Sequence, residues 1–198
     1  KILELLDSDD GGSGINALMG DQDDFNSTIP AHASTNTEFD SYFASGYIKL
    51  AEGRHLVPGD KDVALISKEL AEKNGLSVGD TLTLQMPEFK ADMLGYNADK
   101  AKQDVKIIGL FESTAKSVTQ LSNWSMDNAV YTTLDVVRQI RPDMGDESYE
   151  HIHFYVDDPA RIDDIIKKVN ALPDLDPSDF IINVDSSEVD AVMEPLTN

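Results

Sequence analysis

Cysteine is absent from this chain of 198 residues. Its absence excludes disulfide bonds, thiolate metal sites and a cysteine nucleophile. The sequence also lacks the GxxxxGK phosphate loop, the GxGxxG dinucleotide motif and the Gly-x-Ser-x-Gly nucleophile elbow, which the GGSG stretch at 11–14 does not match. The common signatures of nucleotide binding and of serine or cysteine catalysis are therefore missing.

Basic residues are scarce. Lys and Arg total 16 against 37 Asp and Glu, which gives a net charge of −21 at pH 7. Because phosphate contacts need clustered cations, nucleic acid is not an expected partner, and anionic lipid surfaces would repel the chain. The charge favours solubility and leaves loose binding of divalent cations open.

Long apolar runs are missing as well. No stretch approaches the roughly 18 residues of a membrane-spanning helix. No signal peptide is visible, and the chain begins with Lys1 rather than Met. We therefore take the sequence as a part of a longer protein whose membrane segments can lie elsewhere. Its length allows one large domain or two small ones, and its 40% hydrophobic content is enough for a core.

The stretch LAEKNGLSVGDTLTLQ, residues 70–85, predicts a helix, a turn and a strand. Ser67 caps the helix, and Gly75 ends it in the left-handed conformation. The residues that follow the turn alternate between polar and apolar, as in a half-buried strand. We expect the carboxylate of Asp80 to accept backbone N–H bonds in the turn rather than to act in catalysis.

Other elements are predicted by apolar periodicity and by turn residues. They are an exposed edge strand within 29–36, a helix that ends near Gly46, a buried strand at 63–66, a polar hairpin excursion at 87–104, strands at 105–111 and 129–131, and a helix at 134–140.

The last fifty residues predict a β–α–β unit. Residues 151–156 alternate strictly and indicate a strand. Asp158 is expected to cap a helix with Pro159 at its first position. A second strand is predicted at 180–184.

We predict an α+β fold of two lobes. A central β-rich block at 39–148 is inserted into an α/β unit that is built from the flanking ranges 1–38 and 149–198.

Several clusters of residues could form a functional site, and each can also be explained by a purely structural role. Asp7, Asp9 and Gly12 fit the first positions of a calcium loop, but Gly11 and Leu18 stand where that loop needs an oxygen ligand and a bidentate Glu. We interpret this segment as a solvated acidic loop.

Histidines are the next candidates. His151 and His153 share one face of a predicted strand, but the sequence nominates no third metal ligand. His32 and His55 stand isolated in turn-rich stretches, so we expect them to be surface residues. The sequence thus nominates no catalytic, cofactor-binding or metal-binding residue.

Aromatic residues are interpreted in the same way. The cluster from Phe39 to Tyr47 is expected to be core, whereas Trp124, in a polar and irregular segment, is core or an exposed contact. Since acidic residues are many, a hydrolase that uses an acid pair stays a hypothesis, and it requires a concave pocket with convergent carboxylates.

An ordered set of segments resembles a known family. The set contains YFASGYIKLAEGRHL (42–56), VALISKELAEKNGLSVGDTLTLQ (63–85), VKIIGLFES (105–113), NAVYTTLDVV (128–137) and the terminal β–α–β unit. Within it, Glu52-Gly53-Arg54, Val78-Gly79-Asp80 and Ile108-Gly109 stand in the expected order. The whole resembles the extracytoplasmic core domain of MacB-type ABC transporter permeases, in the MacB/FtsX-like group.

That resemblance implies a domain of two lobes, a porter-like α/β lobe and an inserted, smaller lobe called Sabre, between two transmembrane helices. It implies no catalytic residue and no cofactor, because ATP is hydrolysed by a separate cytoplasmic subunit or domain. The implied partners are that ATP-binding subunit, a second permease copy, and an exported substrate or extracellular protein. The implied location is the outer face of the cell membrane, and the composition suggests a Gram-positive bacterium. If the chain begins inside the porter-like lobe, its first strand is missing. The alternative function is an acidic extracellular binding module, cation-dependent and unconnected with transport.

Overall fold

The computed structural model describes residues 29–114, 126–142 and 158–173, with separate positions at 152, 154, 156, 175–176, 178, 180–182 and 184. The chain divides into two compact units, Lys1–Ser148 and Tyr149–Asn198, and each is described by itself.

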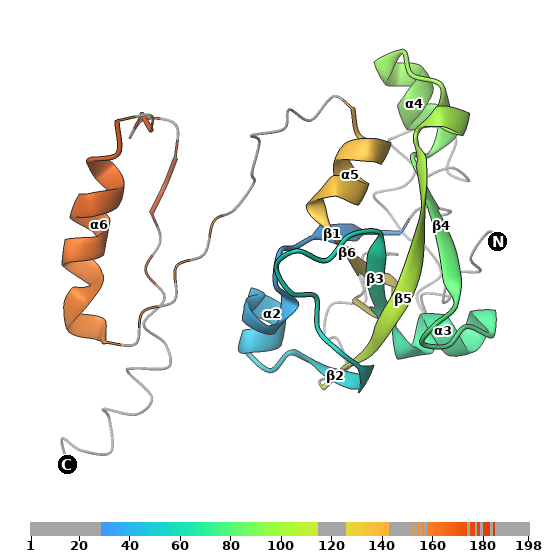
Figure 1. Ribbon diagram of the computed structural model, residues 1–198, viewed down its shortest axis with the longest axis horizontal. Coiled ribbons are helices and arrows are strands. Elements are labelled where there is room, and N and C mark those ends of the chain that lie inside the picture. Colours follow the sequence, from blue (N-terminus) through green and yellow to red (C-terminus); the bar gives the residue numbers. More distant parts are fainter. Residues whose placement is uncertain are drawn as a thin grey trace, which may run out of the picture. The chain divides into compact units, whose positions relative to one another are not determined.

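The first unit is built on one six-stranded sheet (Figure 1). Its strands are β1 (Ala31–Ala33), β2 (Ile48–Gly53), β3 (Val63–Ser67), β4 (Thr81–Gln85), β5 (Lys102–Ser113) and β6 (Val130–Thr132). The order is β1-β6-β3-β5-β2, with β4 also paired to β5. The 12-residue β5 therefore contacts three strands: β3 in parallel, and β2 and β4 in antiparallel pairing.

Short helices surround this sheet. They are η2 (Thr37–Phe39), α2 (Ser41–Ala44), α3 (Lys68–Asn74), α4 (Glu88–Leu94), η3 (Ala98–Lys100), η4 (Met126–Asn128) and α5 (Leu134–Ile140). Together with the sheet they confirm the predicted α+β class. Among the described residues, no helix combines the length and the apolarity needed to cross a bilayer.

Strand β3 lies at the centre of the core. Ala64 and Ile66 belong to one buried cluster, which also contains Leu70 of α3 and Val136 of α5. Leu65 belongs to a second cluster with Phe111 and Tyr131. Because successive side chains of a strand point to opposite faces, β3 is buried on both faces. This confirms the prediction from its continuous apolar run.

Turn chemistry beside α3 follows the sequence prediction. The Ser67 hydroxyl accepts a hydrogen bond from the Leu70 amide (3.0 Å). Gly75 has φ 62° and ψ 40°, and the amide of Leu76 donates back to the carbonyl of Ala71 (2.9 Å). The Asp80 carboxylate accepts from the Ser77 amide (2.9 Å). Asp80 therefore has the structural role that was expected.

The connection from β4 to β5 has more structure than the predicted polar excursion. It contains α4 and η3, which enclose a small core of Met86, Ala91 and Ala101. Strand β5 begins at Lys102, earlier than predicted. The helix was missed because it has only seven residues between Pro87 and Gly95, which is too short for an apolar period to be recognised in a segment predicted as polar.

The second unit contains η5 (Pro159–Arg161) and α6 (Ile162–Asn170). Asp158 caps the first turn by accepting from the Ala160 amide (3.0 Å), as predicted. No residue of α6 is buried. The described positions within 152–156 and 180–184 are not in strands, so only the helix of the predicted β–α–β unit is confirmed.

Strand β1 lies within the range 1–38 that the sequence assigned to the flanking lobe. The structure pairs it with β6, in the sheet of the first unit. The placement of residues 1–28 stays a prediction, because they lie outside the described part of the chain.

Candidate functional site

Segments that carry the three sequence motifs meet at the middle of β5. The amide of Arg54 donates to the carbonyl of Ile108 (3.0 Å), and the amide of Gly79 donates to the carbonyl of Ile107 (2.8 Å). The amide of Ile107 donates in turn to the carbonyl of Asp80 (2.8 Å). We call residues 53–54, 79–80 and 106–109 the β5 junction. Its contacts are between backbones, so the motifs serve the scaffold.

Two glycines make the β5 junction possible. Gly53 and Gly109 face each other across β2 and β5. A Cβ atom on Gly53, which has φ 79°, would overlap the carbonyl oxygen of Ile108 and lie 2.8 Å from the Cα of Gly109. A Cβ on Gly109 would lie 2.6 Å from the carbonyl oxygen of Arg54. Only glycine lets the two backbones approach this closely.

The side chain of Arg54 extends from the β5 junction to the loop that follows β2 and contains Asp60. Its guanidinium donates to both oxygens of Asp60, at 2.6 and 2.8 Å. The same carboxylate accepts from the amide of Val57 (3.0 Å). Hydrogen bonding from Arg54 is the main reason that the pKa of Asp60 is lowered. The pair holds the loop in shape, and sequence reasoning missed it although Asp60 follows Arg54 by only six residues.

A cluster of aromatic rings lies on the face of β3 that carries Leu65. The buried Tyr131 donates its hydroxyl to Asp40 (2.9 Å), which also accepts from the Tyr42 amide (3.0 Å). Burial is the main reason that the pKa of Tyr131 is raised. Phe43 packs against Tyr131, with ring centroids 5.5 Å apart, but Phe39 and Tyr42 are 48% and 41% exposed. In the predicted aromatic core, Phe43 and Tyr47 are therefore half-buried against the core, whereas the prediction is wrong for the exposed Phe39 and Tyr42.

The prediction that His32 and His55 are isolated surface residues is wrong. Both are half-buried. The ring of His32 stacks on Tyr131 at 5.0 Å. The ring of His55 lies 4.9 Å from Phe43, and its Nδ1 lies 3.0 Å from the hydroxyl of Thr37. Burial lowers the pKa of His55. Residues distant in sequence bring these rings together, so local reasoning had no signal for them.

Carboxylates gather where β5 ends. Glu112 pairs with Lys49 (3.0 Å) and Lys68 (3.7 Å). Asp127 accepts from the hydroxyl of Ser113 (2.6 Å), and its carbonyl accepts from the hydroxyl of Ser67. The pKa of the neighbouring Glu69 is raised, mainly by burial and also by surrounding carboxylates. These groups tie η4 to α3 and β5, and the two serine hydroxyls are engaged in these structural bonds.

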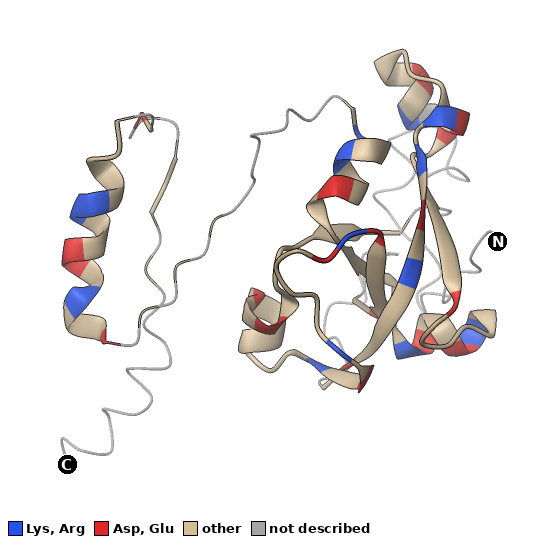
Figure 2. Cartoon of the chain, in the orientation of Figure 1, with Lys and Arg blue, Asp and Glu red and all other residues tan. Residues whose placement is uncertain are grey.

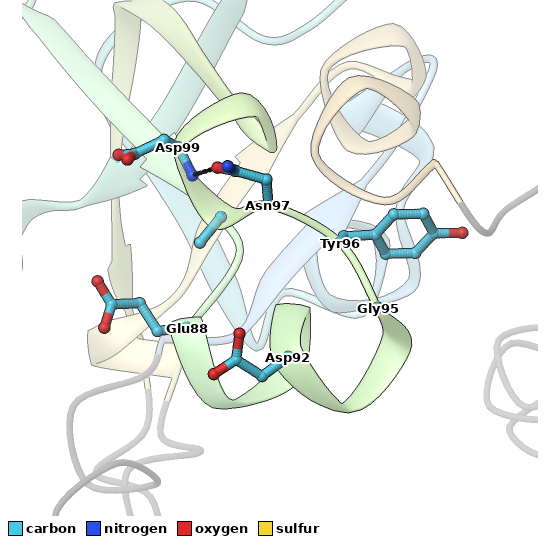
Figure 3. A pocket seen from close by; sticks show the side chains of 7 residues that line it. Glu88, Asp92, Gly95, Tyr96, Asn97 and Asp99 are labelled. Atoms are coloured by element: carbon cyan, nitrogen blue, oxygen red, sulfur yellow. Dashed lines mark hydrogen bonds between the residues drawn. The ribbon is translucent and has the colours of Figure 1, made fainter.

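The connection between β4 and β5 carries an open hollow of about 440 Å³ (Figure 3). Glu88, Asp92 and Asp99 line it, and the side chain of Asn97 caps η3 by accepting from the Asp99 amide (2.9 Å). All three carboxylic residues are exposed. A general acid needs a more desolvated carboxyl group, so the hollow lacks the features of an acid-pair active site. Within the described ranges, no three metal-ligating side chains are grouped to hold an ion.

Several sequence candidates lie outside the described residues. They are the loop of Asp7, Asp9 and Gly12 with its GGSG stretch, Trp124, and the pair His151 and His153.

Comparison with known proteins gives two matches. Residues 13–172 match the family described as MacB-like periplasmic core domain. The chain is also 26% identical over 161 residues to a protein of Bacillus subtilis (strain 168) that carries the name "Uncharacterized ABC transporter permease YclI". The alignment covers 79% of this chain and 31% of that relative. The chain thus spans about a third of the length of the permease it resembles.

Proposed function

The chain belongs to the family of MacB-like periplasmic core domains, and from that premise we propose that it is the extracytoplasmic domain of an ABC transporter permease. In this proposal the domain contacts an exported substrate or an extracellular partner and moves when ATP is bound and hydrolysed on the other side of the membrane. The observation that carries the proposal is the family match over residues 13–172.

The local chemistry supports a non-catalytic role. The motif residues form backbone contacts at the β5 junction. Among the carboxylates, Glu112 pairs with lysines, Asp60 with Arg54 and Asp127 with the hydroxyl of Ser113. ATP hydrolysis then belongs to a separate cytoplasmic subunit, which the permease reaches through its flanking transmembrane helices. A second permease copy completes the proposed assembly.

We propose that the two-lobe organisation holds as well. Residues 1–38 and 149–198 would form the porter-like lobe, and residues 39–148 would form the inserted lobe. The apolar stripe of α6, which contains Ile162, Ile165, Ile166 and Val169, supports this division, because half-buried apolar residues need a covering partner. Strand β1 would then connect the two lobes. The proposed location is the outer face of a Gram-positive cell membrane.

The test uses the complete permease together with its ATP-binding subunit, reconstituted in lipid nanodiscs. Replacing this domain by a flexible Gly-Ser linker should leave basal ATP hydrolysis intact and abolish the response of hydrolysis to the exported substrate. If the parent gene had no hydrophobic spans of about 20 residues beside this region, the proposal would fail. Tight, stoichiometric calcium binding by calorimetry would favour the acidic binding module instead.

A further inference from the structure

The outer edge of β4 presents unpaired backbone groups. Leu82 lies opposite Val105 and Leu84 opposite Gln103 in the ladder with β5. The ladder is bounded by bonds from the Met86 amide to the Ala101 carbonyl (2.9 Å) and from the Ile107 amide to the Asp80 carbonyl (2.8 Å). Hydrogen-bonded positions alternate in antiparallel pairs, so the N–H and C=O groups of Thr81, Thr83 and Gln85 point away from β5. Among the described residues, β4 pairs with β5 alone.

This edge differs from the other two edges of the sheet. Strand β2 carries Lys49, and its register shifts between Leu50 and Glu52. Strand β1 has only three residues and follows Pro30. Such features protect edges from pairing with other chains. In contrast, the five residues of β4 include no charge, no proline and no register shift.

We propose that the outer edge of β4 binds an extended, positively charged polypeptide segment from another molecule by strand addition. A row of alternating N–H and C=O groups is complementary to an extended backbone. Charged residues of both signs flank the edge: Asp80 precedes it, Asp104 lies opposite Thr83, and Lys106 and Lys102 lie opposite Thr81 and Gln85. A positively charged segment is favoured by the net charge of the chain, −21. This inference goes beyond the proposed function, because it does not depend on transport or on ATP.

Charge favours an outside peptide over a second copy of the chain. Each copy carries −21, and like charges oppose the approach of two edges. A peptide with Lys or Arg at alternate positions gains attraction from the same charge. Figure 2 shows the acidic residues distributed among the elements of the described chain.

The test is a titration of the isotope-labelled 198-residue chain with a capped ten-residue peptide of alternating Lys and Val, followed by amide chemical shifts. We expect the amides of Thr81, Thr83 and Gln85 to shift, with a Kd on the order of 1 mM. The same peptide with N-methyl groups at alternate residues should not bind, because its backbone donors are removed.

Two substitutions at Thr83 distinguish the contribution of its backbone N–H to binding from that of its side chain. Thr83→Pro removes an outward N–H without removing a ladder bond and should weaken binding at least about fivefold. Thr83→Val keeps that N–H and, like the proline variant, loses the hydroxyl bond to Asp104 (2.6 Å), so its affinity should change by less than about twofold.

Equal binding by the two variants, or by the N-methylated peptide, overturns the proposal. If Thr83→Pro does not fold, the N-methylated peptide tests the unaltered chain. Shifts of the β4 amides that depend on protein concentration alone would mean that a second copy is the occupant. Slow exchange of these amides that is lost on deletion of residues 1–28 would mean that the chain covers its own edge. Either outcome overturns the assignment of an outside peptide.

Discussion

The two units of this chain differ in how their apolar residues are covered. In the first unit, both faces of β3 are buried, and Leu65, Ile66 and Tyr131 are completely inaccessible to solvent. In the second unit, α6 has an apolar stripe but no buried residue, and Ile181 is 85% exposed. An amphipathic sequence is therefore enough to form a helix and its cap, whereas a core requires a second surface.

The largest expected loss of stability comes from a substitution at the β5 junction of the first unit. Gly53→Ala should lower the free energy of unfolding by about 3–5 kcal/mol, because the added Cβ overlaps backbone atoms of β5 in addition to occupying a left-handed backbone. Gly46→Ala is the matched control. Its φ of 71° is similar, but nothing lies within 4 Å of the added Cβ, so its cost should be about 1 kcal/mol. Urea denaturation followed by circular dichroism measures both, and equal costs would show that the close approach at Gly53 is unimportant.

A second pair of variants compares the units directly. Leu70→Ala in α3 should cost about 2–4 kcal/mol, because Leu70 is fully buried in the larger core cluster. Ile166→Ala in α6 should cost about 1–2 kcal/mol if the proposed two-lobe organisation covers the half-buried stripe. A cost under about 0.5 kcal/mol for Ile166→Ala would mean that α6 remains uncovered, which would contradict the proposed porter-like lobe.

The aromatic cluster offers a smaller test inside the first unit. Tyr131→Phe removes the hydroxyl that donates to Asp40, and it should cost about 1 kcal/mol in the free energy of unfolding. A double-mutant cycle with Asp40→Ala isolates the pair. Additive costs in that cycle would show that the Tyr131 hydroxyl does not stabilise the segment before α2.

The smallest effect concerns pH. The pKa of Glu69 is raised on folding, so the folded state binds more protons than the unfolded state between the ordinary and the raised pKa. Stability contributed by this group is therefore lost as the pH rises through that window. Glu69→Gln should stabilise the chain at pH 7 by less than about 1 kcal/mol, because the side chain is partly exposed. The two proteins should be equally stable at pH 3, and a constant difference at all pH values would rule out titration of Glu69 as the cause.

Features that depend on neighbouring residues were predictable from the sequence. The caps at Ser67 and Asp158, the left-handed Gly75 and the role of Asp80 follow from local hydrogen-bond rules. The family resemblance was also readable, because its motifs occur in order along the chain.

Features that depend on distant residues were not predictable. Gly53 and Gly109 meet only because β2 and β5 pair, and the sequence gives no indication of that close contact. His32 and His55 join the aromatic cluster through β1 and through the loop after β2. The helix α4 was missed for a different reason, since a helix of seven residues is too short to show a clear apolar period.

The pairing of β1 with β6 has a consequence for how the chain folds. Ala31 lies opposite Val130, so this strand pair closes a loop that contains most of the first unit. Contacts between residues so far apart in sequence are slow to form, because the entropy of loop closure is lost before the contact is gained. During synthesis, β1 cannot pair with β6 until the chain has been extended through residue 132. We therefore expect the first described strand to be among the last parts of the sheet to become ordered.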